Sequence, residues 1–283
     1  MKFKIVFIGG LTNGKKLLEF LDNDNDSLVE LIVTYPKEIN RPRYAEIYKK
    51  DNTKIIYDTD ISGYIDLVKG IEPDFIFVCG WSYIVPESIL KIAKIATIGF
   101  HPSKLPIDRG RSVLAWQIEE GYSETALSMF YLEKKVDAGD LIDQIIIKIN
   151  EQDNINDILE KIDINTKCII EKNYPLLKKN KIKPVVQNEK FSTYRILRTN
   201  KNSLIQWDNL AINIHNKIRA ITKPYPGAEG FLGKEKYKFW KSIVSSKGIS
   251  EKNYINGYFK FKKDHIMVKC KDKFIKIIDY EKL

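Results

Sequence analysis

Two side chains in this sequence have the chemistry of a general acid-base pair. His101 ends the apolar run ATIGFH and is followed by a proline and a polar loop, so we expect it at an exposed strand tip rather than in the core. Asp137 lies in the acidic turn VDAGD, where Gly139 permits a backbone conformation that other residues avoid. An imidazole and a carboxylate can move protons together if the fold brings them into contact.

Both residues also have ordinary explanations. A lone histidine is more often structural than catalytic, and VDAGD is equally compatible with a plain hairpin turn that exposes Asp137 and Asp140 to solvent. Spacing along the chain does not decide between these readings. A position at the carboxyl end of a parallel strand favours catalysis, because open α/β sheets bind their ligands there.

A second group of residues has the chemistry to hold an anion. The first turn, GGLTNG, lacks the GxGxxG spacing of a dinucleotide site, so we do not expect NAD. Gly10, Thr12 and Asn13 at the following helix start suit phosphate binding through backbone N–H groups, or simple helix capping. Arg109 and Arg111 can pair with phosphates bidentately, or be solvated loop charges.

The elements that must position these residues alternate between strand and helix patterns. Short apolar runs occur at 3–8, 28–35, 54–60, 74–80 and 96–103, with helical periodicity between most of them. The run DFIFVCG is apolar on both faces, as a parallel sheet covered by helices requires. We therefore predict an α/β fold with a Rossmann-like open sheet. The segments ALSMFYLE and LIDQIIIKI predict two strands that flank the Asp137 turn.

The chain is long enough for more than one compact unit, since single cores stop growing near ~250 residues. We expect a first domain over 1–184, a polar linker over 185–202 and a β-rich, OB-like C-terminal subdomain over 203–283. Tyr254, Tyr258 and Phe259 alternate in this tail and suit either a small barrel core or a surface that forms a homodimer.

Composition narrows the class of protein. Hydrophobic residues make up 43% and charged residues 30% of the chain, which is ordinary globular usage. The net charge of +10 comes from scattered lysines, so we do not expect a nucleic-acid partner. Three distant cysteines predict neither disulfides nor a metal site, and no apolar run approaches the ~18 residues of a membrane span. We expect a cytoplasmic protein.

The stretch from Thr97 to Gln144 resembles the folate-dependent formyltransferases, which act on methionyl-tRNA, glycinamide ribonucleotide or sugar nucleotides. The family pattern is Asn-x-His, a Ser-Leu-Leu-Pro-like loop, a glycine and a D-x-G turn. In this sequence His101, the SKLP loop, Gly110 and Asp137 occupy those places.

One position departs from the family pattern. The family asparagine, which helps to stabilise the oxyanion of the tetrahedral intermediate, falls on Gly99. Losing such a donor can cost ~10²-fold to 10³-fold in rate. We expect that Ser103 or a residue from Trp81 to Tyr83 replaces it.

The resemblance implies a mechanism and a set of contacts. The co-substrate is 10-formyltetrahydrofolate, His101 polarises the oxyanion, Asp137 accepts or relays the amine proton, and no metal takes part. The pterin is expected against Gly80, Trp81, Ser82, Tyr83 and Ile84 and against Val136, Ala138 and Gly139. Substrate contacts are expected from Gly10, Thr12, Asn13, Ser103, Arg109, Gly110 and Arg111.

A further question is which amine accepts the formyl group. The segment SLIQWDNLAINIHNKIRAITKPYPGAEGFLGKEKYKFWKSIV resembles the family's appended domain, and its PYPGA turn is closer to the sugar-nucleotide branch. We expect a nucleotide-linked aminodeoxy sugar, such as a 4-amino-4,6-dideoxy sugar for a surface glycan. Methionyl-tRNA is the alternative, with KEINRPRYAEIYKK as a modestly basic contact. A third possibility is an inactive homologue that binds folate or sugar, because of Gly99.

Overall fold

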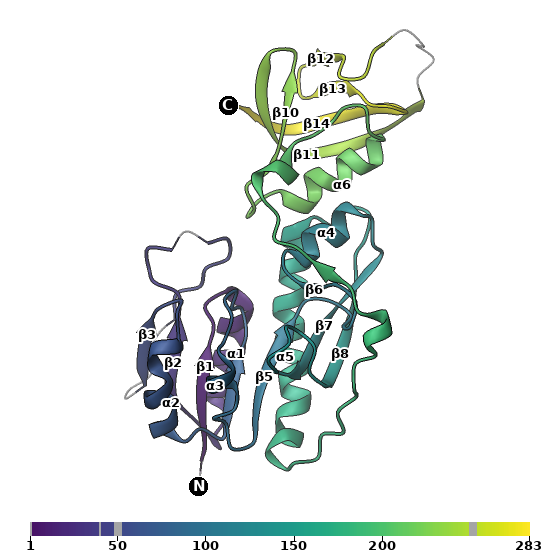
Figure 1. Cartoon of the computed structure of the whole chain (residues 1–283). Coiled ribbons are helices and arrows are strands. Elements are labelled where there is room, and N and C mark those ends of the chain that lie inside the picture. Colours follow the sequence, from purple (N-terminus) through teal and green to yellow (C-terminus); the bar gives the residue numbers. More distant parts are fainter. Residues whose placement is uncertain (1, 40, 48–52, 249–253) are drawn as a thin grey trace. The chain divides into compact units, whose positions relative to one another are not determined.

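The structure is a computed structural model that describes residues 2–39, 41–47, 53–248 and 254–283. It divides into two compact units (Figure 1). Unit 1 comprises Met1–Gly110, Ala126–Ile147 and Glu160–Tyr194, and unit 2 comprises Arg111–Thr125, Lys148–Leu159 and Arg195–Leu283. Each unit is therefore built from separate stretches of the chain, whereas the expected boundaries at 184 and 203 divide the chain into consecutive stretches.

The core of unit 1 is a seven-stranded sheet in the order β3-β2-β1-β4-β5-β7-β8. Its strands are β1 (Phe3–Ile8), β2 (Ser27–Thr34), β3 (Lys54–Tyr57), β4 (Phe75–Val78), β5 (Ala96–His101), β7 (Glu124–Tyr131) and β8 (Leu141–Lys148). The strands β1 to β5 are parallel, and β7 runs antiparallel to β5. Strand order reverses between β1 and β4, which makes this a topological switch point, and the predicted Rossmann-like sheet is confirmed.

Helices cover both faces of this sheet: α1 (Thr12–Asn23), the short turn η1 (Ser62–Tyr64), α2 (Ile65–Ile71), α3 (Glu87–Leu90) and α5 (Ile155–Lys178). On one face, Val68 of α2 and Ile89 of α3 belong to the same core cluster as Ile76 of β4. On the other face, Tyr174 of α5 makes ring contacts with Phe75 and Phe77. Cover on both sides explains why the strands are apolar on both faces.

The register of β5 decides where His101 points. Val78 of β4 pairs with Gly99 of β5, and Ile76 pairs with Thr97. Because side chains alternate along a strand, Gly99 and His101 face the same side as Ile76, the side that α2 and α3 cover. His101 thus ends β5 at the carboxyl edge of the parallel strands.

The segment after α5, where a polar linker over 185–202 is expected, contains short structured elements. Val185 forms a bridge with Leu141, and η2 (Glu189–Phe191) follows. The two-residue strand β9 (Tyr194–Arg195) then pairs with β6 (Arg109–Gly110), before η3 (Asn200–Ser203). Polar side chains here are engaged by hydrogen bonds, so composition alone could not distinguish this segment from a solvated linker.

Unit 2 holds the β-rich domain, and that prediction is confirmed. Its sheet is antiparallel in the order β10-β11-β14-β13-β12, and α6 (Ala211–Ile221) packs on β11 and on α4 (Val113–Glu119). The strands are β10 (Ala228–Leu232), β11 (Glu235–Gly248), β12 (Phe259–Phe261), β13 (Ile266–Lys269) and β14 (Lys273–Lys282). Tyr254 stacks on the exposed Tyr258, so this pair is not the core of a barrel.

In the described part of the chain, no helix combines the length and apolar character needed to cross a membrane.

Candidate active site

His101 and Asp137 meet in the structure. The Nδ1 atom of His101 lies 3.4 Å from Oδ2 of Asp137, and the two side chains are only 7% and 14% exposed. The same Oδ2 accepts the backbone N–H of Gly110 at 2.8 Å. Strand β5, strand β6 and the turn between β7 and β8 each contribute one of these groups, which lie far apart in the sequence.

The imidazole of His101 is oriented by a backbone carbonyl. Its Nε2 atom lies 2.8 Å from the carbonyl oxygen of Asp108. A carbonyl can only accept a hydrogen bond, so Nε2 carries the hydrogen and Nδ1 is the atom that gains or loses a proton. The expectation of an exposed tip is wrong, because the loop from Pro102 to Gly110 folds back and buries the ring.

The turn that carries Asp137 has an unusual backbone. Asp137 itself adopts a left-handed conformation with φ of 53°, whereas Gly139 does not. Gly139 is needed for a different reason: a Cβ there would lie 1.9 Å from the carbonyl oxygen of Tyr131. The expected role of Gly139 is therefore corrected from conformational freedom to close approach of two backbone segments.

Gly99 leaves the position of the family asparagine without an amide. A Cβ at Gly99 would lie 2.7 Å from Cδ2 of Leu132, so the Leu132 side chain fills this space. Ser103 is fully buried and its hydroxyl donates to the carbonyl oxygen of Ile107, which removes it as a replacement. Trp81 instead carries a buried Nε1–H that has no hydrogen-bond partner among the described residues.

The two segments expected to hold the pterin lie close to each other. Lys134, three residues before Asp137, forms an ion pair of 3.3 Å with Glu87, three residues after Ile84. Both segments display apolar side chains, with Ile84 80% and Val136 48% exposed. Apolar groups at a strand-end edge suit a flat aromatic ligand. The contacts of Gly80, Trp81, Ser82, Tyr83, Ile84, Val136, Ala138 and Gly139 with a pterin stay a prediction.

The first helix start is closed by the chain itself. The N–H of Thr12 donates to the Arg43 carbonyl oxygen, and its hydroxyl donates to Oδ1 of Asp163. The N–H of Gly10 donates to Gly80, and the Asn13 amide contacts the sulfur of Cys79. Since these donors are engaged and a carboxylate lies beside them, the geometry disfavours phosphate binding. It does not support helix capping either, because Leu11 stands at the N-cap of α1 and no side chain there makes a capping hydrogen bond.

Arg109 is also unavailable to a substrate phosphate. The whole side chain is buried, and its guanidinium donates to Glu189, Gln187 and the Tyr194 hydroxyl. Burial and paired acceptors make it part of the protein interior, which corrects its expected role in substrate binding. Arg111 is exposed, and it remains a candidate for substrate contact.

Sequence reasoning missed Gln187 and Glu189, which contact Arg109. Both lie in the stretch expected to be a linker, and nothing in their residue types signals burial or pairing. A buried guanidinium needs hydrogen-bond acceptors from other parts of the chain. Had burial of Arg109 been expected, it would have indicated that acceptors such as Gln187 and Glu189 had to lie nearby.

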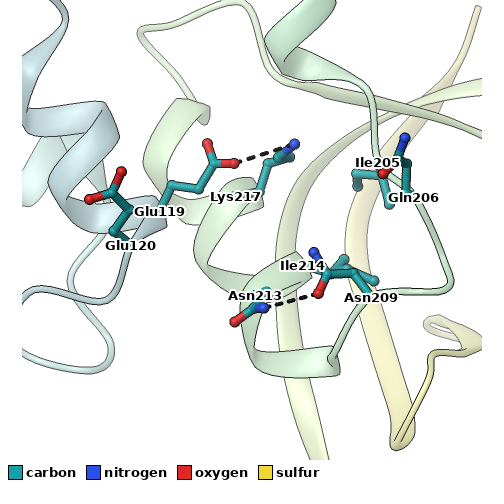
Figure 2. Close-up of a pocket in the computed structure, with 8 residues that line it drawn as sticks. All are labelled: Glu119, Glu120, Ile205, Gln206, Asn209, Asn213, Ile214 and Lys217. Carbon is teal, nitrogen blue, oxygen red and sulfur yellow. Dashed lines mark hydrogen bonds and ion pairs between the residues drawn. The ribbon is translucent and has the colours of Figure 1, made fainter. Parts of the chain in front are cut away.

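Unit 2 contains an open pocket of about 370 Å³, shown in Figure 2. Its lining residues are Glu119, Glu120, Ile205, Gln206, Asn209, Asn213, Ile214 and Lys217. Figure 2 shows Lys217 paired with Glu119, and Arg195 pairs with Glu120. Because these carboxylates are neutralised by cations, the pocket offers no acid-base chemistry comparable to that of His101. Within the described ranges, no group of His, Cys, Asp and Glu side chains could hold a metal ion.

Two family models match the sequence. The model described as "Formyl transferase" matches residues 3–171, and "Formyl transferase, C-terminal domain" matches residues 198–282. The first match alone covers more than half of the chain. The chain belongs to the formyl transferase family.

Individual relatives agree with this assignment. The chain is 32% identical over 258 residues to the methionyl-tRNA formyltransferase of Mesoplasma florum, covering 89% of this chain and 82% of that protein. It is 33% identical over 231 residues to the bifunctional polymyxin resistance protein ArnA of Wigglesworthia glossinidia brevipalpis. This second match covers 81% of the chain but only 35% of that longer protein.

A solved structure shows the same fold over the full length. The N-formyltransferase from Helicobacter canadensis, crystallised with folinic acid and dTDP-3-aminofucose, matches with a TM-score of 0.73. The match covers 99% of this chain and 100% of that one at 20% sequence identity.

Proposed function

We propose that this formyltransferase moves a formyl group from 10-formyltetrahydrofolate to the amine of a nucleotide-linked aminodeoxy sugar. The observation that carries formyl transfer is the buried contact between His101 and Asp137 at the carboxyl edge of β5. Full-length likeness to the Helicobacter canadensis enzyme, crystallised with a folate and an amino sugar nucleotide, supports both substrates. The product fits surface glycan biosynthesis, and a 4-amino-4,6-dideoxy sugar is one candidate within this class of acceptors.

The geometry supports a simple sequence of proton movements. The neutral amine attacks the formyl carbon, a C–N bond forms, and the carbonyl oxygen becomes an oxyanion. The amine proton passes to the edge formed by His101 Nδ1 and Asp137, where the carboxylate stabilises the imidazolium. The bond from the formyl carbon to N10 then breaks, and N10 of tetrahydrofolate takes a proton as it leaves.

Methionyl-tRNA is the second candidate acceptor. The observation that favours it is 32% identity over most of the length of the Mesoplasma florum enzyme. The basic segment expected to contact tRNA, residues 37–50, includes Asn40 and residues 48–50, which lie outside the described residues. A tRNA acceptor and a sugar acceptor differ so much in size that one assay separates them.

The test offers both acceptors to the same enzyme. The protein is incubated with 10-formyltetrahydrofolate and either a panel of nucleotide-linked amino sugars or charged initiator tRNA, and product mass is measured. We expect one added formyl group on a sugar nucleotide, lost in His101→Asn and retained in His265→Asn, whose partly buried ring pairs with Asp264. Formylated tRNA instead would establish the second candidate. Folate binding without product in either assay would indicate an inactive homologue.

A further inference from the structure

The turn that carries Asp137 requires support from outside itself. A left-handed conformation at an aspartate is sparsely populated, and it persists only when the surrounding structure over-determines it. Nδ1 of His101 and Oδ2 of Asp137 are 3.4 Å apart, so a small displacement of the carboxylate would break this contact. The question is which residues hold this turn.

A single buried amide fixes the backbone of the turn. Nε2 of Gln187 donates to the carbonyl oxygen of Asp137 at 2.9 Å and to that of Gly139 at 2.7 Å. The Gln187 residue is 4% exposed, so no solvent replaces these bonds if they are lost. Two carbonyls, one at Asp137 and one two residues later, are thereby held by one side chain.

Arg109 determines the orientation of that amide. Its Nη2 and Nε atoms donate to Oε1 of Gln187 at 2.8 and 3.3 Å. Since a guanidinium only donates, the amide oxygen must face Arg109 and the NH₂ group must face the turn. The next residue, Gly110, donates its N–H to the Asp137 carboxylate. The β6 segment therefore holds the turn through its main chain and, by way of Gln187, through Arg109.

Glu189 binds the same guanidinium and balances the positive charge of Arg109. Its carboxylate accepts from Arg109 at 2.7 Å and from Lys135 at 2.5 Å, two residues before Asp137. The hydrogen bonds from Arg109 and Lys135 lower the pKa of Glu189 to about 2, so it stays ionised at neutral pH. The turn is therefore tied at Lys135, Asp137 and Gly139 to one polar cluster.

We infer that Gln187, oriented by Arg109, is a positioning residue that holds Asp137 in its catalytic place beside His101. This inference rests on the proposed function, because it assigns the segment after α5 a role in formyl transfer. It predicts that loss of the Gln187 donors slows the chemical step and leaves substrate binding largely unchanged.

The test compares two buried amides of unit 1. Gln187→Met removes the donors to the turn at nearly constant volume. Asn173→Leu is the matched control: Asn173 is 3% exposed, and its Nδ2 donates two bonds of 2.8 Å, to Asp143 and to the Ile169 carbonyl, with none to the turn. Gln187→Glu, which retains an oxygen toward Arg109 and lacks the donors, substitutes for Gln187→Met if that variant does not fold.

Two readouts decide the outcome. With the acceptor that gives turnover, we expect kcat of Gln187→Met to fall about 10-fold to 100-fold below that of Asn173→Leu, with little change in KM. We also expect the imidazole ¹⁵N signal of His101 Nδ1 to move only in Gln187→Met. The chain has three histidines, which makes this signal assignable. Equal kcat values with an unmoved His101 signal would overturn the inference.

The imidazole readout separates this inference from the proposed function. If the native protein formylates no acceptor, the proposed function fails, and the inference is then decided by the His101 signal alone. A signal that moves in Gln187→Met and not in Asn173→Leu retains the positioning role, and a signal that moves in neither rejects it.

Discussion

At the scale of residues, His101 can exchange a proton only through the atom that faces Asp137. Its Nε2 atom is held by the Asp108 carbonyl oxygen, and its Nδ1 atom lies beside the carboxylate. A negative charge at this distance stabilises the protonated ring, so the charge of Asp137 matters as well as its shape.

Asp137→Asn tests that charge. An amide oxygen can still accept the N–H of Gly110, so the turn is expected to keep its geometry. We expect kcat to fall by about 10²-fold to 10⁴-fold, because the imidazolium loses its counter-charge. Single-turnover formyl transfer measures the effect. Asp140→Asn, in the same turn, is the control, and a native rate in Asp137→Asn would contradict the assignment.

A second question at this scale is which donor would stabilise the oxyanion, because Gly99 stands where the family has asparagine. Trp81 lies just beyond β4, which pairs with the strand of Gly99, and its buried Nε1–H has no partner among the described residues. Trp81→Phe removes this donor and leaves a ring to stack on Tyr35. If Trp81 replaces the family asparagine, kcat is expected to fall by about 10²-fold to 10³-fold.

The matched control for this variant is Trp207→Phe. The Nε1–H of Trp207 donates to the Phe231 carbonyl oxygen in unit 2, so its loss is expected to affect stability and not kcat. A native kcat in Trp81→Phe, measured at saturating folate, would show that the oxyanion is stabilised by another group.

At the scale of elements, the turn between β7 and β8 depends on the absence of a side chain at Gly139. Gly139→Ala would place a Cβ 1.9 Å from the Tyr131 carbonyl oxygen, and backbone atoms on both sides leave little freedom to adjust. We expect the variant to lose about 1–3 kcal/mol of unfolding free energy, measured by urea titration. Gly63→Ala, where a Cβ meets nothing within 4 Å, is expected to change it little.

The ion pairs of Glu189 with Arg109 and Lys135 make the free energy of unfolding depend on pH. The hydrogen bonds from Arg109 and Lys135 lower the pKa of Glu189 to about 2, against an ordinary value of 4.5. The folded state therefore resists protonation, so this contribution is complete above pH 4.5 and is lost as pH falls toward 2. Melting temperatures from pH 7 to pH 3 should fall more in the native protein than in Glu189→Gln. Parallel curves would contradict this pairing.

Elements differ in how far sequence predicts them. The parallel strands and the helices between them were predictable because burial on both faces leaves a continuous apolar run, as in β4. The segment containing Gln187 was not predictable, because its order comes from hydrogen bonds to Arg109 and to the Asp137 turn. Likewise, residue type, the strand-end position and the family resemblance predicted His101 and Asp137 as candidates, while the buried Asp108 contact that orients the ring depends on how the loop folds back.

At the scale of the whole molecule, the chain passes between the two units several times. Helix α5 begins in unit 2 and continues in unit 1, and the short segment 111–125 interrupts unit 1 in sequence. Neither unit is a single continuous stretch of chain, so removing one would cut elements that belong to the other. Truncation of the chain at residue 184 or 203 would therefore not separate the two units.

The cysteines report on the two units separately. Cys79 is buried in unit 1 and Cys270 in unit 2, whereas Cys168 is exposed. Burial raises the pKa of the Cys79 thiol, and it raises that of Cys270 to about 12, so neither forms a reactive thiolate in the folded state. Under native conditions we expect one fast-reacting thiol, that of Cys168, and three after denaturation.

Pulsed alkylation in increasing urea, read by peptide mass, tests whether the units unfold together. Because α5 is shared, unfolding of either unit breaks a helix that the other needs, and we expect Cys79 and Cys270 to become reactive over the same urea range. Cys168→Ser removes the background of the exposed thiol. Labelling of Cys270 at clearly lower urea than Cys79 would instead show that unit 2 opens while unit 1 keeps its sheet, and with it the contact between His101 and Asp137.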